Sequence, residues 1–142
     1  YVINPHIRVR SVANGKELTA GGPTVRYTMP SLACSPDSKR LVAAVQLSLH
    51  VYSTDRLEFE KWDVRKDGRK HFTGIAFHPS GKYLAATSND ETVKLYDTNT
   101  WAVAHTFTWK IGRMRSIAFS PDGALAAAGS DKGQVVVWDV DL

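Results

Sequence analysis

One sequence pattern occurs three times in this chain, and its regular spacing constrains the fold more than any other feature. The three copies are SLACSPDS at 31–38, GIAFHPSG at 74–81 and SIAFSPDG at 116–123. Their prolines, Pro36, Pro79 and Pro121, lie 43 and 42 residues apart. A fixed period of about 20 to 50 residues indicates a repeat architecture, in which each unit is one supersecondary structure that packs against its neighbours.

Each proline is followed by two further segments that predict β-strands. The first is an apolar run with paired alanines, LVAAV at 41–45, YLAAT at 83–87 and ALAAA at 124–128. The second alternates in polarity and ends on Tyr52, Tyr96 or Trp138. Short segments of this composition, bounded by turn residues such as Pro-Asp-Gly, are typical of strands. No window keeps a helical period. The sequence therefore predicts an all-β fold with about four short strands per period, which is typical of a propeller blade.

A fourth, partial copy opens the chain. A leading strand is expected at 7–11, because Arg10 lies one period before Tyr52, and the Asn14-Gly15 dipeptide after it favours a hairpin turn. The repeats then run approximately over 12–53, 54–97 and 98–139, so that one repeat array covers residues 1–142.

The ends of the repeats resemble a known family. The aromatic–acid pairs Trp138-Asp139 and Tyr96-Asp97, and the weaker Tyr52-Ser53, are similar to the dipeptide that gives the WD-repeat family its name. This resemblance implies a β-propeller of four-stranded antiparallel blades, with strands a to d from the central channel outward and each repeat running d-a-b-c. It also implies structural roles at the repeat positions Asp90, Asp131, Tyr52, Tyr96 and Trp138.

The sequence also departs from the pattern of the family. A Gly-His pair that commonly precedes the innermost strand is missing from KIGRM at 110–114 and from GRKH at 68–71. The hydrogen-bond network that this histidine joins in the family is therefore not expected in full. Arg10 replaces the aromatic residue in the leading strand.

Three blades cannot close a ring, because each blade buries its faces against two neighbours and an open arc leaves apolar faces in water. Two explanations follow from the sequence. The chain is a partial propeller whose missing amino-terminal blades belong to a longer protein, or it is half of an oligomeric ring that a homodimer completes.

Composition and motifs exclude several classes of function. Hydrophobic residues make up 43% and charged residues 23%, and no apolar run is long enough to cross a membrane. Cys34 is the sole cysteine, so we expect no disulfide within the chain, a reducing compartment such as the cytoplasm, and a small buried side chain at this apolar repeat position. The five histidines lack the spacing of a metal site, and the glycine-rich stretches match neither a nucleophile elbow nor a phosphate-binding loop. No catalytic residue, metal or cofactor is predicted.

Basic residues gather in the connections that the resemblance places between strands d and a, on the face that propellers of this family use for binding. The predicted residues are Arg65, Lys66, Arg69, Lys70 and His71 in one connection, Lys110, Arg113 and Arg115 in the next, and Arg26 in the preceding one. Together they are called the basic rim. We expect a non-catalytic scaffold whose basic rim binds an acidic or phosphorylated protein segment. A small patch and a net charge of +4 disfavour nucleic acid. The alternatives are an ordinary solvated surface on a purely structural segment, and part of a propeller enzyme with its site over the channel.

Overall fold

The computed structural model describes residues 7–21, 31–54, 59–65 and 70–140. Within these ranges the chain forms strands and turns without a helix, which confirms the predicted all-β class. The strands are β1 (Ile7–Arg10), β2 (Glu17–Gly21), β3 (Ser31–Cys34), β4 (Arg40–Val45), β5 (Ser48–Ser53), β6 (Phe59–Arg65), β7 (Phe72–Phe77), β8 (Tyr83–Ser88), β9 (Thr92–Asp97), β10 (Val103–Thr108), β11 (Met114–Phe119), β12 (Leu125–Ser130) and β13 (Val135–Asp139).

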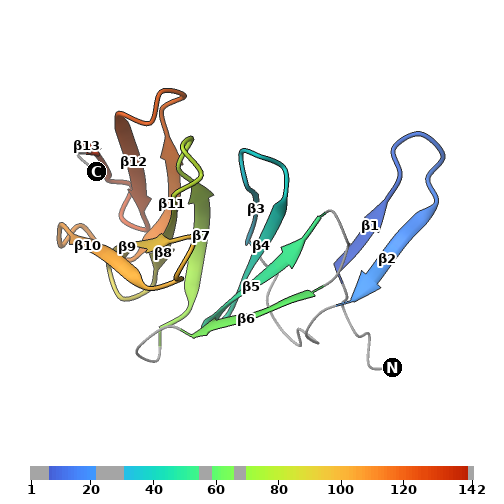
Figure 1. The fold of residues 1–142 in the computed structure, drawn as a ribbon. Helices are drawn as coiled ribbons and strands as arrows, with labels where there is room; N and C mark the ends of the chain where they lie inside the picture. Colours follow the sequence, from blue (N-terminus) through green and yellow to red (C-terminus); the bar gives the residue numbers. More distant parts are fainter. Residues whose placement is uncertain (1–6, 22–30, 55–58, 66–69, 141–142) are drawn as a thin grey trace.

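The strands form antiparallel sheets that follow one another in chain order (Figure 1). Strands β3 to β6 make blade I, β7 to β10 make blade II, and β11 to β13 make blade III; β1 and β2 form a leading hairpin. The outer strand of a blade comes from the following repeat: β6 pairs with β5 of blade I, although the chain then continues into blade II. The predicted architecture of four-stranded antiparallel blades in a partial propeller is confirmed.

The leading hairpin explains how an arginine can replace an aromatic residue. Arg10 is exposed and forms an ion pair with Glu17 on the opposite strand, with 3.6 Å between Nη2 and Oε2. The predicted turn at Asn14-Gly15 closes this hairpin, and the Asn14 side chain accepts a hydrogen bond from the backbone N–H of Lys16 at 3.0 Å. The pairing of β1 with β2 therefore does not depend on an aromatic side chain packing at position 10.

Neighbouring blades are joined by the apolar side chains that alternate along their middle strands. Val42, Leu49 and Val51 of blade I are fully buried and pack against blade II. One repeat later, Val93 and Leu95 of blade II are fully buried in a second core, which they share with blade III. Since the apolar faces meet between blades, most of the hydrophobic stabilisation lies at the interfaces between repeats.

The same register positions are exposed in blade III. Val135 and Val137 correspond to Val93 and Leu95, but 69% and 60% of their surfaces are accessible. No described residue packs over this side of blade III, so the difference comes from the surroundings and not from the strand itself.

The expectation that Cys34 is buried is wrong. Cys34 is exposed, and so is Leu32, at 51%, two residues earlier on the same side of β3. Only Ala33, on the opposite side of the strand, packs into the core with blade II. Among the described residues, no blade covers the other side of β3.

The inner strands approach one another closely at the centre of the array. Strand β7 contacts β3 and β4 on one side and β11 on the other. A Cβ atom at Gly74 would lie 3.0 Å from the backbone oxygen of Arg115 and 3.0 Å from Oγ1 of Thr87. Glycine at this position thus lets β7 and β11 come together.

The Ser-Pro-Asp turns are closed by side chains within the turn. In blade III the hydroxyl of Ser120 donates to Asp122 at 2.5 Å, and the carboxylate also accepts the backbone N–H of Ala124 at 3.0 Å. Ser35 and Asp37 repeat this arrangement in blade I, with 2.6 Å between Oγ and Oδ1. The sequence motif therefore stabilises its own hairpin, as is typical of an Asx turn.

These turns predict a loss of stability in acid. Hydrogen bonds from Ser35 and Ser120 hold the pKa values of Asp37 and Asp122 below the ordinary 3.8, and the backbone N–H of Thr100 does the same for Asp97. A lowered folded-state pKa adds stability above 3.8 that disappears as the pH falls through the folded value. We expect the melting temperature to fall below about pH 4, and to fall less steeply in a variant with asparagine at all three positions. An equally steep fall in that variant, measured by circular dichroism, would contradict this origin.

Candidate binding surface

The antiparallel topology places two kinds of connection at the same end of each blade. The connection from the outer strand of one blade to the inner strand of the next, such as 109–113 between β10 and β11, lies beside the turn between the second and third strands. In blade III that turn is formed by residues 131–134. The two are hydrogen-bonded, since the backbone N–H of Asp131 donates to the carbonyl oxygen of Arg113 at 2.9 Å.

The structure describes part of the predicted basic rim. Lys70, His71, Lys110, Arg113 and Arg115 are all exposed at this end. Arg65 ends β6, whereas Arg26, Lys66 and Arg69 lie outside the described residues. His71 adjoins the turn of blade II, because its carbonyl oxygen accepts hydrogen bonds from the backbone of Asn89 and the hydroxyl of Ser88, both at 3.1 Å.

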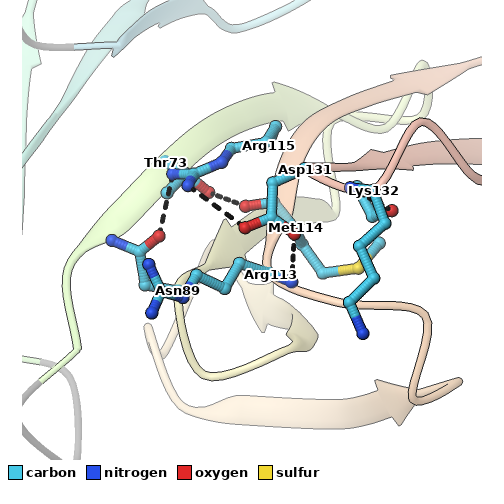
Figure 2. A network of polar contacts seen from close by, with 8 residues as sticks. Thr73, Asn89, Arg113, Met114, Arg115, Asp131 and Lys132 are labelled. Carbon is cyan, nitrogen blue, oxygen red and sulfur yellow. Dashed lines mark hydrogen bonds and ion pairs between the residues drawn. The ribbon is translucent and has the colours of Figure 1, made fainter.

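Arg115 forms a polar network between blades II and III (Figure 2). One guanidinium nitrogen donates to the side-chain oxygen of Asn89 in blade II at 2.9 Å, and the other lies 3.5 Å from the Asp131 carboxylate in blade III. The arginine side chain remains 45% exposed. Much of its charge is therefore balanced by Asp131, and its geometry is fixed by contacts within the chain.

The carboxylate of Asp131 also orders the connection before β11. Its Oδ1 accepts the backbone N–H of Arg113 at 3.0 Å, while Oδ2 faces Arg115. The sequence lacks the histidine that is common in the family at this point, and a backbone N–H is the donor to the turn aspartate instead. This acid lies 16 residues beyond Arg115 in the sequence, so the carboxylate that faces the connection comes from outside it.

The basic rim includes a residue that the sequence analysis did not select. Lys132 follows Asp131 in the turn of blade III, and its stem lies over Gly112, where a Cβ atom would be 3.0 Å from Cγ of the lysine. Figure 2 shows Lys132 and Arg113 on either side of Asp131, at the seam between blades II and III. The side-chain charges of Lys110, Arg113 and Lys132 make no hydrogen bond or ion pair with any residue that the structure describes. In the family topology the turn at 131–134 lies on this face. That placement is the signal that could have identified Lys132 from the sequence.

The remaining predicted repeat residues lie in the turns and cores. Asp90 accepts the backbone N–H and the hydroxyl of Thr92, at 3.2 and 2.6 Å. Tyr52 and Tyr96 are buried, and burial raises the pKa of Tyr52. Trp138 packs on Trp109 with ring centroids 4.6 Å apart, and no described residue accepts a hydrogen bond from its indole nitrogen.

A second polar cluster holds the inner strands below the basic rim. The hydroxyl of Thr73 on β7 donates to the carbonyl oxygen of Met114 on β11 at 2.7 Å and lies 2.9 Å from the hydroxyl of Thr87. Met114 itself is fully buried. These contacts tie blade II to blade III beneath the exposed cations, so the two blades present one continuous surface.

Among the residues that the structure describes, no three His, Cys, Asp or Glu side chains are grouped to hold a metal ion. The same residues include no helix with the length and hydrophobicity needed to cross a membrane.

Comparison with known proteins identifies the repeat. The model of the WD domain, G-beta repeat matches residues 66–97 and 102–139, which include every strand of blades II and III. The chain belongs to the WD-repeat family. The WD-repeat chain is 37% identical over 115 residues to protein HIR1 of Cryptococcus neoformans, an alignment that covers 75% of this chain and 13% of HIR1.

Two further relatives have names that describe an association. Actin-interacting protein 1 of Drosophila melanogaster is 28% identical over 119 residues, covering 82% of this chain and 19% of that protein. The target of rapamycin complex subunit wat1 of Schizosaccharomyces pombe is 28% identical over 109 residues, covering 77% and 34%. The WD-repeat chain thus spans about a third or less of these curated relatives.

Proposed function

We propose that this WD-repeat chain is a non-catalytic scaffold that binds an acidic or phosphorylated segment of a protein partner through its basic rim. One observation carries the proposal: the charges of Lys110, Arg113 and Lys132 are exposed at one seam and have no partner among the described residues. Their combined field attracts anionic ligands, and arginine can hold a carboxylate or phosphate with two parallel hydrogen bonds.

Arg115 has a different role in this proposal. Its contacts with Asn89 and Asp131 hold the seam together, so it positions the neighbouring cations. The relatives support a protein partner, because the names of two of them describe association with actin and membership of a protein complex. Action in the cytoplasm, and completion of the ring by a second copy or by further blades, stay predictions.

The proposal is tested with a fluorescein-labelled peptide that contains several phosphoserines flanked by glutamate. We expect Arg113→Ala to weaken binding about threefold to tenfold, and Lys110→Ala with Arg113→Ala to weaken it further and to reduce its salt dependence. Fluorescence anisotropy across a salt series measures both quantities.

Lys16→Ala is the matched control, because it removes one exposed cation from the leading hairpin, away from the seam. Affinity and salt dependence should stay close to those of the parent chain. If Lys16→Ala weakens binding as much as Arg113→Ala does, the attraction comes from net charge alone and the basic rim is not a site.

A further inference from the structure

A groove of about 770 Å³ lies between blades I and II, at the end of the propeller opposite the basic rim. It is bounded by the turns that join the first two strands of each blade, at 35–40 and 77–82, and by Ser53, Thr98 and Asn99 after the third strands. Pro36, Phe77 and Pro79 supply apolar surface, and Lys39, Arg40 and Lys82 supply positive charge. Its volume falls in the range of about 300 to 1,000 Å³ that is usual for ligand sites.

The next seam along the array shows why this groove is open. Between blades II and III, the imidazole of His78 reaches across so that Nε2 lies 3.1 Å from the carbonyl oxygen of Gly123. The same ring packs edge-on against Phe119, with centroids 5.1 Å apart. His78 therefore occupies the space between these two turns.

Blade I has a serine where blade II has this histidine. Ser35 precedes Pro36 just as His78 precedes Pro79, and its hydroxyl turns back to bond Asp37 in its own turn. A Cβ atom at Gly123 would lie 2.5 Å from His78, but one at Gly81 would meet only Cδ of Pro36, at 3.9 Å. Phe77, the counterpart of Phe119, consequently lines the groove.

Among the described residues that line the groove, positive charges outnumber negative ones. Asp37 is the only acidic residue among the described residues of its lining, and its carboxylate is engaged by Ser35 and by the backbone N–H of Lys39 at 3.0 Å. Arg40 donates to the carbonyl oxygen of Thr98 at 3.0 Å, which bridges the two blades. Lys39 and Lys82 are exposed, and their ammonium groups contact no acid among the residues that the structure describes.

We propose that this groove binds an extended protein segment in which carboxylates alternate with aliphatic side chains. Successive side chains of an extended peptide point to opposite sides, so one set packs on Phe77, Pro36 and Pro79 while the other reaches Lys39 and Lys82. A single-stranded nucleic acid fits less well, since its bases need stacking platforms and Phe77 is the one aromatic ring among the described residues of the lining.

The direct test measures the anisotropy of a fluorescein-labelled octapeptide of alternating glutamate and leucine, mixed with the 142-residue chain. We expect saturable binding, and binding about tenfold weaker when glutamine replaces every glutamate or serine replaces every leucine. Absence of binding by the glutamate–leucine peptide overturns the proposal, and so does tighter binding of a single-stranded RNA of similar length at the same site.

The variant Ser35→His tests whether the peptide binds in the groove. It gives blade I the residue that blade II has at the same repeat position, so the imidazole should cover Phe77 and lower peptide affinity about tenfold or more while the circular dichroism spectrum is unchanged. Lys39→Ala with Lys82→Ala tests the charges without filling the groove and should weaken binding by a similar factor. This pair remains informative if the histidine disturbs folding.

Arg113→Ala separates this proposal from the basic rim. It should lower the affinity for the glutamate–leucine peptide far less than the groove variants do, because the two surfaces lie at opposite ends of the blades. If Arg113→Ala weakens that affinity and the groove variants do not, the peptide binds the basic rim and the groove proposal fails. If only the groove variants weaken binding of the glutamate–leucine peptide, and the rim variants leave the affinity for the phosphopeptide unchanged, the basic rim proposal fails instead.

Discussion

Truncation of Val93 to alanine is expected to lower the free energy of unfolding by about 2 to 3 kcal/mol, whereas the same change at Val135 should alter it by less than about 0.5 kcal/mol. The two valines occupy equivalent positions on the third strands of successive blades. Val93 is fully buried against blade III, and its truncation leaves a cavity between the two sheets. Val135 is 69% exposed, so its methyl groups lose little contact when they are removed.

Urea unfolding followed by tryptophan fluorescence measures both values. The substitution, the strand and the register are identical, so intrinsic β-propensity cancels in the comparison and burial alone separates the variants. Equal destabilisation at both positions would mean that the side of blade III bearing Val135 is covered in solution, for example by a second copy. Sedimentation of the parent chain would then show that association.

Substitution of Gly112 by alanine has the second large effect, a destabilisation of about 2 to 4 kcal/mol. Gly112 has a φ of 109°, which L-residues rarely adopt, and a Cβ atom there would lie 2.7 Å from Oδ1 of Asp131. The added methyl group therefore both strains the backbone and displaces the carboxylate that accepts the Arg113 N–H. The connection before β11 and the turn of blade III should loosen together.

Gly133→Ala is the control for backbone strain alone. Gly133 also has a positive φ, 73°, but nothing lies within 4 Å of a Cβ atom at that position. We expect it to cost about 1 kcal/mol, so the difference between the two variants reports the contact with Asp131. Chemical denaturation gives both values, and indistinguishable midpoints would show that the carboxylate adds nothing at this seam.

The sequence was sufficient for the features that repeat. Pro36, Pro79 and Pro121 set the period, and the alternating segments that end at Tyr52, Tyr96 and Trp138 became strands because local composition and turn chemistry agree there. The basic connections could also be recognised, since charge is visible in the sequence without a fold.

Features that depend on a neighbouring blade could not be predicted in the same way. Asp131 and Lys132 join the basic rim from a turn that follows β12, so the seam contains charges that are separated in the sequence. The exposure of Cys34 reflects what lies beside β3, which its apolar repeat position does not reveal. The groove exists because Ser35 is small where His78 is large, a difference that matters only once two turns face each other.

The outer strand of each four-stranded sheet is supplied by the repeat that follows, as β6 shows by pairing with β5. A segment of one period, such as β6 to β9, can therefore be deleted or duplicated and still leave every sheet with its full set of strands, because β10 would then pair with β5 as β6 does. Recombination between repeats does not need to respect the boundaries of a blade. An array of this kind can change its number of blades through single genetic events, and each new seam offers another pair of facing turns whose side chains can diverge.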